Sequence, residues 1–129
     1  RNDKNFDRKV NKTMKTKAFL TLLSKKYRDG EVLFVDSLSF KTPKTAEAVS
    51  TLANLSKAKG FEKLSTKRKN SAFIGLSKKD VATEKSFRNI GSVMVDEFRN
   101  VNLLDVLKHT YLVIENPVEA VKLIEAKLN

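Results

Sequence analysis

Acidic side chains near the ends of predicted strands are the first candidates for chemistry. Asp36 follows one apolar run, and Asp96 and Glu97 end another. Carboxylates at such positions can hold Mg²⁺ or accept a phosphoryl group, as in receiver-type or phosphatase-type α/β domains. The same residues also serve as ordinary loop-edge and helix-capping groups. No partner lysine or second acidic cluster stands at a recognisable spacing, so the sequence favours this structural role.

Other catalytic constellations are missing from the sequence. His109 is the only histidine and has no cysteine or serine neighbours for a triad, which favours a capping or hydrogen-bonding role. Gly30, Gly60, Gly75 and Gly91 are isolated and form neither a Gly-x-Gly-x-x-Gly turn nor a phosphate loop. We therefore expect no enzyme activity, cofactor, metal or small-molecule substrate.

Basic side chains are concentrated in the first part of the chain. The net charge is +11, from 26 Lys and Arg against 15 Asp and Glu. Residues 1–80 carry 20 basic and 8 acidic side chains, whereas residues 81–129 carry 6 and 7. This asymmetry indicates a surface that faces a polyanion. A solvated coat of lysines is the alternative that composition leaves open.

The stretch 8–28 combines this charge with the apolar spacing of a helix. Its lysines are three or four residues apart, where like charges repel, and phosphates would relieve that repulsion and release counterions. Structured RNA, held by its backbone and shape, is therefore the predicted partner. Two apolar rows are expected to face inward: Val10, Met14, Ala18 and Leu22, and beside them Phe19, Leu23 and Tyr27. The charge of the helix is extended by Lys17, Lys25 and Lys26.

Strand and helix patterns alternate along the chain. They predict one α/β domain with a mostly parallel, four-stranded sheet and helices on both faces, Rossmann-like but without a glycine-rich nucleotide loop. No apolar run approaches the roughly 18 residues of a membrane span. Cysteine is absent, which is compatible with the cytosol. The predicted strands are 31–38, 71–76, 92–97 and 110–115, and the predicted helices are 8–28, 41–60, 80–91, 103–108 and 116–128. The nearly continuous apolar run in 31–38 indicates a strand buried on both faces.

Two of these helices have recognisable starts. Thr42 is expected to cap the second helix, with Pro43 in its first turn. Asn116 and Glu119 form a variant of the capping box around Pro117 in the last helix. The expected inward side of the second helix is Ala46, Val49, Ala53 and Leu55.

Three stretches, in this order, resemble the C-terminal part of the bacterial large-subunit ribosomal protein L-four (uL-four) family. They are RKVNKTMKTKAFLTLLSKK, SFKTPKTAEA and SFRNIGSVMVDEFRNVNLLDVLKHTYLVIENPVEAVKLIEAKL. The family's N-terminal segment and tunnel loop are not in this sequence, which begins with Arg1, so we expect a piece of a longer chain. On this view residues 1–7 are an irregular lead-in, and residues 8–129 form one rRNA-binding α/β domain.

The resemblance implies a structural constituent of the large ribosomal subunit. Such a protein would bind 23S-type rRNA, touch neighbouring ribosomal proteins, support early subunit assembly and reside on cytoplasmic ribosomes, away from membranes. Two alternatives remain: a metal-dependent phosphoryl-transfer or receiver-like module that uses Asp36 and Asp96, and an interaction module for an acidic protein. The rRNA-binding residues that the resemblance implies are Arg8, Lys9, Lys12, Lys15, Lys17, Lys41, Lys44, Arg88 and Asn89.

Overall fold

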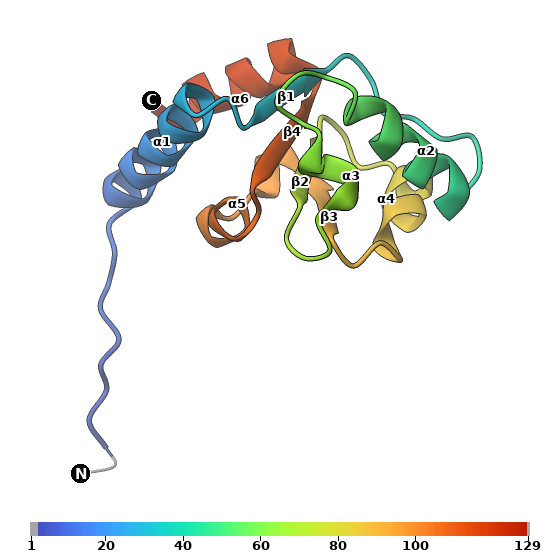
Figure 1. Ribbon diagram of the computed structural model, residues 1–129. Coiled ribbons are helices and arrows are strands. Elements are labelled where there is room, and N and C mark those ends of the chain that lie inside the picture. The colour runs from blue at the N-terminus through green and yellow to red at the C-terminus, as the bar shows by residue number, and fades with distance from the viewer. Residues whose placement is uncertain (1–2, 129) are drawn as a thin grey trace.

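The computed structural model describes residues 3–128 and is built on a parallel sheet (Figure 1). The order across the sheet is β1-β4-β2-β3, and every neighbouring pair is parallel. The predicted α/β class and four-stranded parallel sheet are confirmed. The strands are β1 (Val32–Val35), β2 (Ala72–Leu76), β3 (Val93–Glu97) and β4 (Tyr111–Glu115).

Helices cover both faces of this sheet, as predicted (Figure 1). One face carries α2, α3 and α4, and the other carries α1, α5, α6 and the short 3₁₀ helix η1. The helices are α1 (Lys12–Arg28), α2 (Thr45–Leu55), α3 (Lys63–Thr66), α4 (Val81–Arg88), η1 (Phe98–Asn100), α5 (Leu103–Lys108) and α6 (Pro117–Leu128).

The central strands β2 and β4 explain the continuous apolar runs of the sequence. All five residues of β2 and the first four of β4 are buried, because helices pack on both sides of them. Alternate side chains enter opposite clusters: Phe73 and Leu112 pack toward α1 and α6, and Ile74 and Val113 toward α2 and α4. At Gly75 an added Cβ would lie 2.8 Å from Cδ2 of Phe98, so the sheet needs glycine there.

The first strand differs from its prediction. A strand buried on both faces was expected over 31–38, but β1 spans Val32–Val35 and lies at the edge of the sheet. Its residues are half-buried, apart from Phe34, which is 47% exposed. The apolar run is therefore that of an edge strand, with Leu38 buried in the loop that follows.

The first helix also differs, because its N-terminal part extends past the sheet (Figure 1). It begins at Lys12, and residues 3–10 are neither helix nor strand. Of the expected inward rows, Phe19 is buried, but Met14 is 60% and Tyr27 71% exposed. Without a sheet beneath its first turns, this part of α1 has no core in which to bury Met14. In the last turns Lys26 is the buried residue, and Tyr27 beside it is exposed.

The second helix is shorter and rotated relative to the prediction. It begins at Thr45 after Lys44, so neither Thr42 nor Pro43 belongs to it. Its buried residues are Ala48 and Leu52, whereas Ala46, Val49 and Ala53 are exposed. Two short helices were not predicted: α3, in the loop before β2, and η1, which follows β3.

The start of α6 is half of the predicted capping box. Oδ1 of Asn116 accepts a hydrogen bond from the Glu119 N–H at 3.4 Å. The reciprocal bond does not form, since the Asn116 N–H donates to the Val35 carbonyl at 2.9 Å. Asn116 thus joins the C-terminal end of β1 to α6, at a φ of 47°.

At the start of α4, Asp80 accepts hydrogen bonds from the Thr83 hydroxyl and from the N–H groups of Ala82 and Thr83. These bonds, the Thr83 hydroxyl foremost, hold the pKa of Asp80 below its usual range. A carboxyl with a lowered folded-state pKa stabilises the fold above its unfolded value, near pH 4, and that stabilisation disappears as pH falls through the folded-state pKa.

We therefore expect Asp80→Asn to weaken the acid dependence of stability. Asparagine keeps the capping oxygen but does not titrate, so the urea midpoint should fall less steeply below about pH 4 than in the parent protein. Asp80→Ala should lower the midpoint at neutral pH as well, because the cap itself is lost. Parallel acid profiles for the parent and Asp80→Asn would contradict the assignment.

Candidate nucleic-acid interface

Five of the predicted RNA-binding residues lie on α1 or just before it. Arg8 and Lys9 belong to the exposed segment that leads into the helix, and Lys12, Lys15 and Lys17 lie in its first two turns. All five side chains are exposed, and within residues 3–128 no carboxylate forms an ion pair with them. They form a cationic projection at the N-terminal end of the domain.

These lysines do not share one face of α1. At about 100° per residue, Lys12 and Lys15 lie within about 40° of Phe19, whereas Lys17 lies about 160° from it. Lys15 borders an apolar groove of about 730 Å³ between α1 and α5, which Met14 and Leu104 also line. Cations therefore surround this end of the helix on several sides.

The other four predicted residues lie across the sheet from α1. The Lys44 N–H donates to the Ser86 hydroxyl of α4 at 3.0 Å, so the loop that carries Lys41 and Lys44 packs beside α4. Arg88 is the last residue of α4, and Asn89 is its C-cap. The nine predicted residues thus form two groups on opposite faces, with no single surface joining them.

Lys44 is also less available than the residues on α1. Its Nζ lies 3.2 Å from Oε1 of Glu47, one turn along α2. This pair is exposed, with side chains 60% and 47% accessible, so its stabilising effect is small. A phosphate at Lys44 would have to compete with Glu47, whereas a phosphate at Lys12 or Lys15 would not.

The prediction that Lys26 extends the basic surface of α1 is wrong. Its side chain is 8% accessible, and its ammonium group donates three hydrogen bonds. The acceptors are the Glu31 carboxylate at 2.7 Å, the His109 carbonyl at 2.9 Å and the Thr110 carbonyl at 2.7 Å. Lys26 therefore joins the C-terminal end of α1 to the start of β4.

His109 has the hydrogen-bonding role expected from sequence. It is the C-cap of α5, and its Nδ1 lies 2.7 Å from the Asp105 carbonyl oxygen. The ring is buried near Phe73, with 6.3 Å between ring centroids. Its environment is that of a structural side chain.

The two acidic residues of the phosphoryl-transfer alternative lie on opposite edges of the sheet. Asp36 follows β1 and Asp96 belongs to β3, and β4 and β2 lie between these strands. Three strand spacings separate them by about 14 Å. One Mg²⁺ ion binds its oxygens at roughly 2.1 Å, so the two carboxylates cannot hold the same ion. Within residues 3–128, no three His, Asp or Glu side chains are placed to share a metal.

Small ligands of parallel sheets usually bind beyond the carboxyl ends of the strands. In this protein, polar groups at those ends are hydrogen-bonded to one another. Glu115, at the end of β4, accepts hydrogen bonds from the Leu38 N–H at 2.8 Å and the Ser77 N–H at 2.9 Å. The Ser77 hydroxyl donates to the same carboxylate at 3.1 Å. Two backbone donors that could face a phosphate are thus already used.

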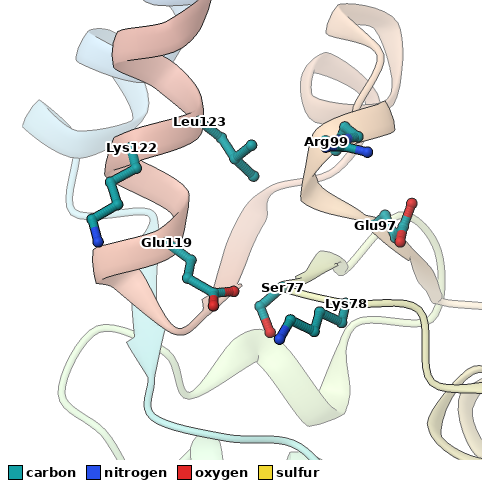
Figure 2. Close-up of a pocket in the computed structure, with 7 residues that line it drawn as sticks. All are labelled: Ser77, Lys78, Glu97, Arg99, Glu119, Lys122 and Leu123. Atoms are coloured by element: carbon teal, nitrogen blue, oxygen red, sulfur yellow. The ribbon is translucent and has the colours of Figure 1, made fainter.

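A shallow pocket of about 350 Å³ lies at this edge, and its charges are mixed. Figure 2 shows Glu119 of α6 pointing toward Ser77, with Glu97 and Arg99 on the opposite wall and Lys122 pointing away. Carboxylates beside the lysines make this pocket a poor match for a polyanion. The described helices include none that is long and apolar enough to cross a bilayer.

Comparison with known proteins gives a consistent picture. The model of the ribosomal protein L4/L1 family matches residues 1–127. A protein of Symbiobacterium thermophilum named large ribosomal subunit protein uL4 is 40% identical over 70% of this chain and 39% of its own length. Those of Desulforudis audaxviator and Natranaerobius thermophilus are 32% and 31% identical over 86% and 95% of this chain. The chain spans about half the length of these relatives, between 39% and 53%.

Proposed function

Because the chain belongs to the ribosomal protein L4/L1 family, we propose that it is a structural, non-catalytic constituent of the large ribosomal subunit. It binds large-subunit rRNA through phosphates and shape, supports early subunit assembly and contacts neighbouring ribosomal proteins on cytoplasmic ribosomes. Residues 8–129 are the rRNA-binding domain, preceded by the lead-in 1–7.

One observation carries this proposal: the cations at the start of α1 have no carboxylate partners within residues 3–128. Arg8, Lys9, Lys12, Lys15 and Lys17 are all exposed on a part of the chain that extends past the sheet (Figure 1). Lysine positions a phosphate as a point charge and does not read bases in a fixed geometry. A projecting helix with cations on several sides suits a groove or junction of folded RNA better than a flat surface.

The charge on Lys9, Lys12 and Lys15 should account for part of the salt dependence of RNA binding. Replacing all three by alanine should reduce the slope of log K against log salt by about 2 to 3 units, since each phosphate contact contributes roughly 0.7 to 0.9. The measurement is a salt titration with a large-subunit rRNA fragment, in the presence of an unrelated structured RNA of equal length.

The matched control removes three lysines from the opposite face, Lys57, Lys59 and Lys85, all exposed. This variant should keep most of the parent slope. If both triple variants lose the same slope, binding depends only on net charge, and the assignment to α1 is wrong. If the parent protein shows no preference for the rRNA fragment, the proposed function itself is contradicted.

A further inference from the structure

A second group of cations gathers at the amino edge of the sheet, where two loops meet. Lys67, Arg68 and Lys69 lie in the loop before β2, and Lys108 ends α5, three residues before β4. Because β2 and β4 are neighbours in the sheet, these loops emerge side by side. We call these four residues the amino-edge cluster.

Hydrogen bonds hold the two loops together. The Thr110 N–H donates to the Asn70 carbonyl at 3.1 Å, and the Tyr111 N–H donates to the Ser71 carbonyl at 2.9 Å. The Lys67 ammonium donates to the Thr110 hydroxyl. Asn70 has a φ of 50°, which makes a tight turn directly after Lys69. The loop therefore presents Arg68 and Lys69 from a fixed backbone, not from a loose tail.

The cluster concentrates positive charge without internal compensation. Its four side chains are exposed, and within residues 3–128 none forms an ion pair. Of the acidic groups near the starts of β1 and β4, Asp29 and Glu31 are paired with Lys25 and Lys26, and Glu62 accepts a hydrogen bond from the Gly60 N–H at 3.0 Å. By contrast, Glu97, Glu115 and Glu119 lie among the cations of the carboxyl edge. The amino ends of the strands are therefore better suited to bind an anion than the carboxyl ends.

We propose that the amino-edge cluster is a second phosphate-binding surface for structured RNA, separate from α1. The inference rests on the proposed function and extends it to residues outside the predicted set. Arg68 can bind a phosphate with two parallel N–H···O bonds, and the lysines around it add point charges. Counterions released from the RNA supply the favourable free energy of binding.

The composition of the loop favours RNA over an acidic protein as the partner. Residues 67–70 are Lys-Arg-Lys-Asn, with no apolar side chain among them. A protein interface needs a desolvated apolar centre, which these residues do not provide, whereas phosphate recognition does not need one. Protein partners would be drawn instead to apolar surfaces such as the groove beside Met14 and Leu104.

The test removes two charges from this cluster and two from an equivalent exposed loop. Arg68→Ala with Lys69→Ala should reduce the salt slope for the rRNA fragment by about 1.5 units, while Lys57→Ala with Lys59→Ala should change it by less than about 0.5. Lys67 is left in place because it bonds Thr110. Thermal unfolding of both double variants checks that each retains the parent fold.

Combination with the α1 triple variant separates this inference from the proposed function. Contacts to different phosphates should reduce the slope additively, so the five-residue variant should lose the sum of the two effects. If the parent and α1 variant behave as expected but the Arg68 and Lys69 variant matches its control, only the second surface is refuted. If that variant retains its RNA slope yet loses binding to polyglutamate, the surface serves an acidic protein and the RNA inference is wrong.

Discussion

Lys26→Met should lower the free energy of unfolding by about 3 kcal/mol, more than any other single lysine substitution within residues 3–126. Methionine keeps the length and packing of the side chain but cannot donate to Glu31, His109 or Thr110. Breaking a buried ion pair leaves an uncompensated carboxylate and typically costs about 3 to 5 kcal/mol. Glu31 is 31% accessible, so water recovers part of that cost.

The neighbouring residue provides a matched control for this prediction. Lys25 also pairs with a carboxylate, Asp29 at 2.8 Å, but its side chain is 65% accessible. Lys25→Met should therefore leave the urea midpoint close to that of the parent protein. Equal midpoints for the two variants would show that the bonds of Lys26 do not stabilise the fold, whatever their geometry.

The burial of Lys26 could not be predicted from the charge of the sequence. The sequence counts it among the charges of a basic helix, yet it lies seven residues after Phe19, on the same stripe of α1. Its spacing from Phe19 is therefore that of the buried side of the helix. A lysine is rarely buried unless it is paired, and besides the Glu31 carboxylate two of the three acceptors are carbonyl groups more than 80 residues away. No local pattern predicts those acceptors.

The sheet was predictable because its central strands follow a local rule. Continuous apolar runs such as 111–114 indicate strands covered on both faces, and helical spacing between them implies parallel crossovers. The edge position of β1 was not predictable, since its run looks the same as that of β4. Only the strand order distinguishes them, and strand order depends on which helices fit on each face of the sheet.

The cations of the candidate interface could be predicted from sequence, but their arrangement in space could not. Sequence locates the cations of α1, but the expected inward rows assume a helix that is buried along its whole length. In the structure, α1 extends past the sheet, which exposes Met14 beside Lys15 and separates both from Lys44 and Arg88. Charge alone also gave no reason to include Arg68 and Lys69 in the predicted interface, because their setting depends on a hydrogen bond between Asn70 and Thr110.

The carboxyl ends and the amino ends of the strands differ in a way that fits the proposed binding of RNA. At the carboxyl edge, Glu115 brings together the loops after β1 and β2. A nucleotide phosphate at that place would meet a carboxylate and backbone donors that are already bonded. The cations proposed to bind RNA lie elsewhere, at the start of α1 and at the amino edge, where an extended polyanion can reach them.

Glu115→Ala should lower the free energy of unfolding by about 2 to 3 kcal/mol. The substitution removes the acceptors of the Leu38 N–H, the Ser77 N–H and the Ser77 hydroxyl, and hydrogen bonds to charged groups contribute about 1.5 to 3 kcal/mol each before water compensates the exposed donors. A graded series in urea checks the mechanism. Ser77→Ala loses only the hydroxyl bond and should cost least, whereas Glu115→Gln keeps one acceptor and should lie between them. If Ser77→Ala destabilises as much as Glu115→Ala, the carboxylate does not hold the two loops together, and the closed carboxyl edge needs another explanation.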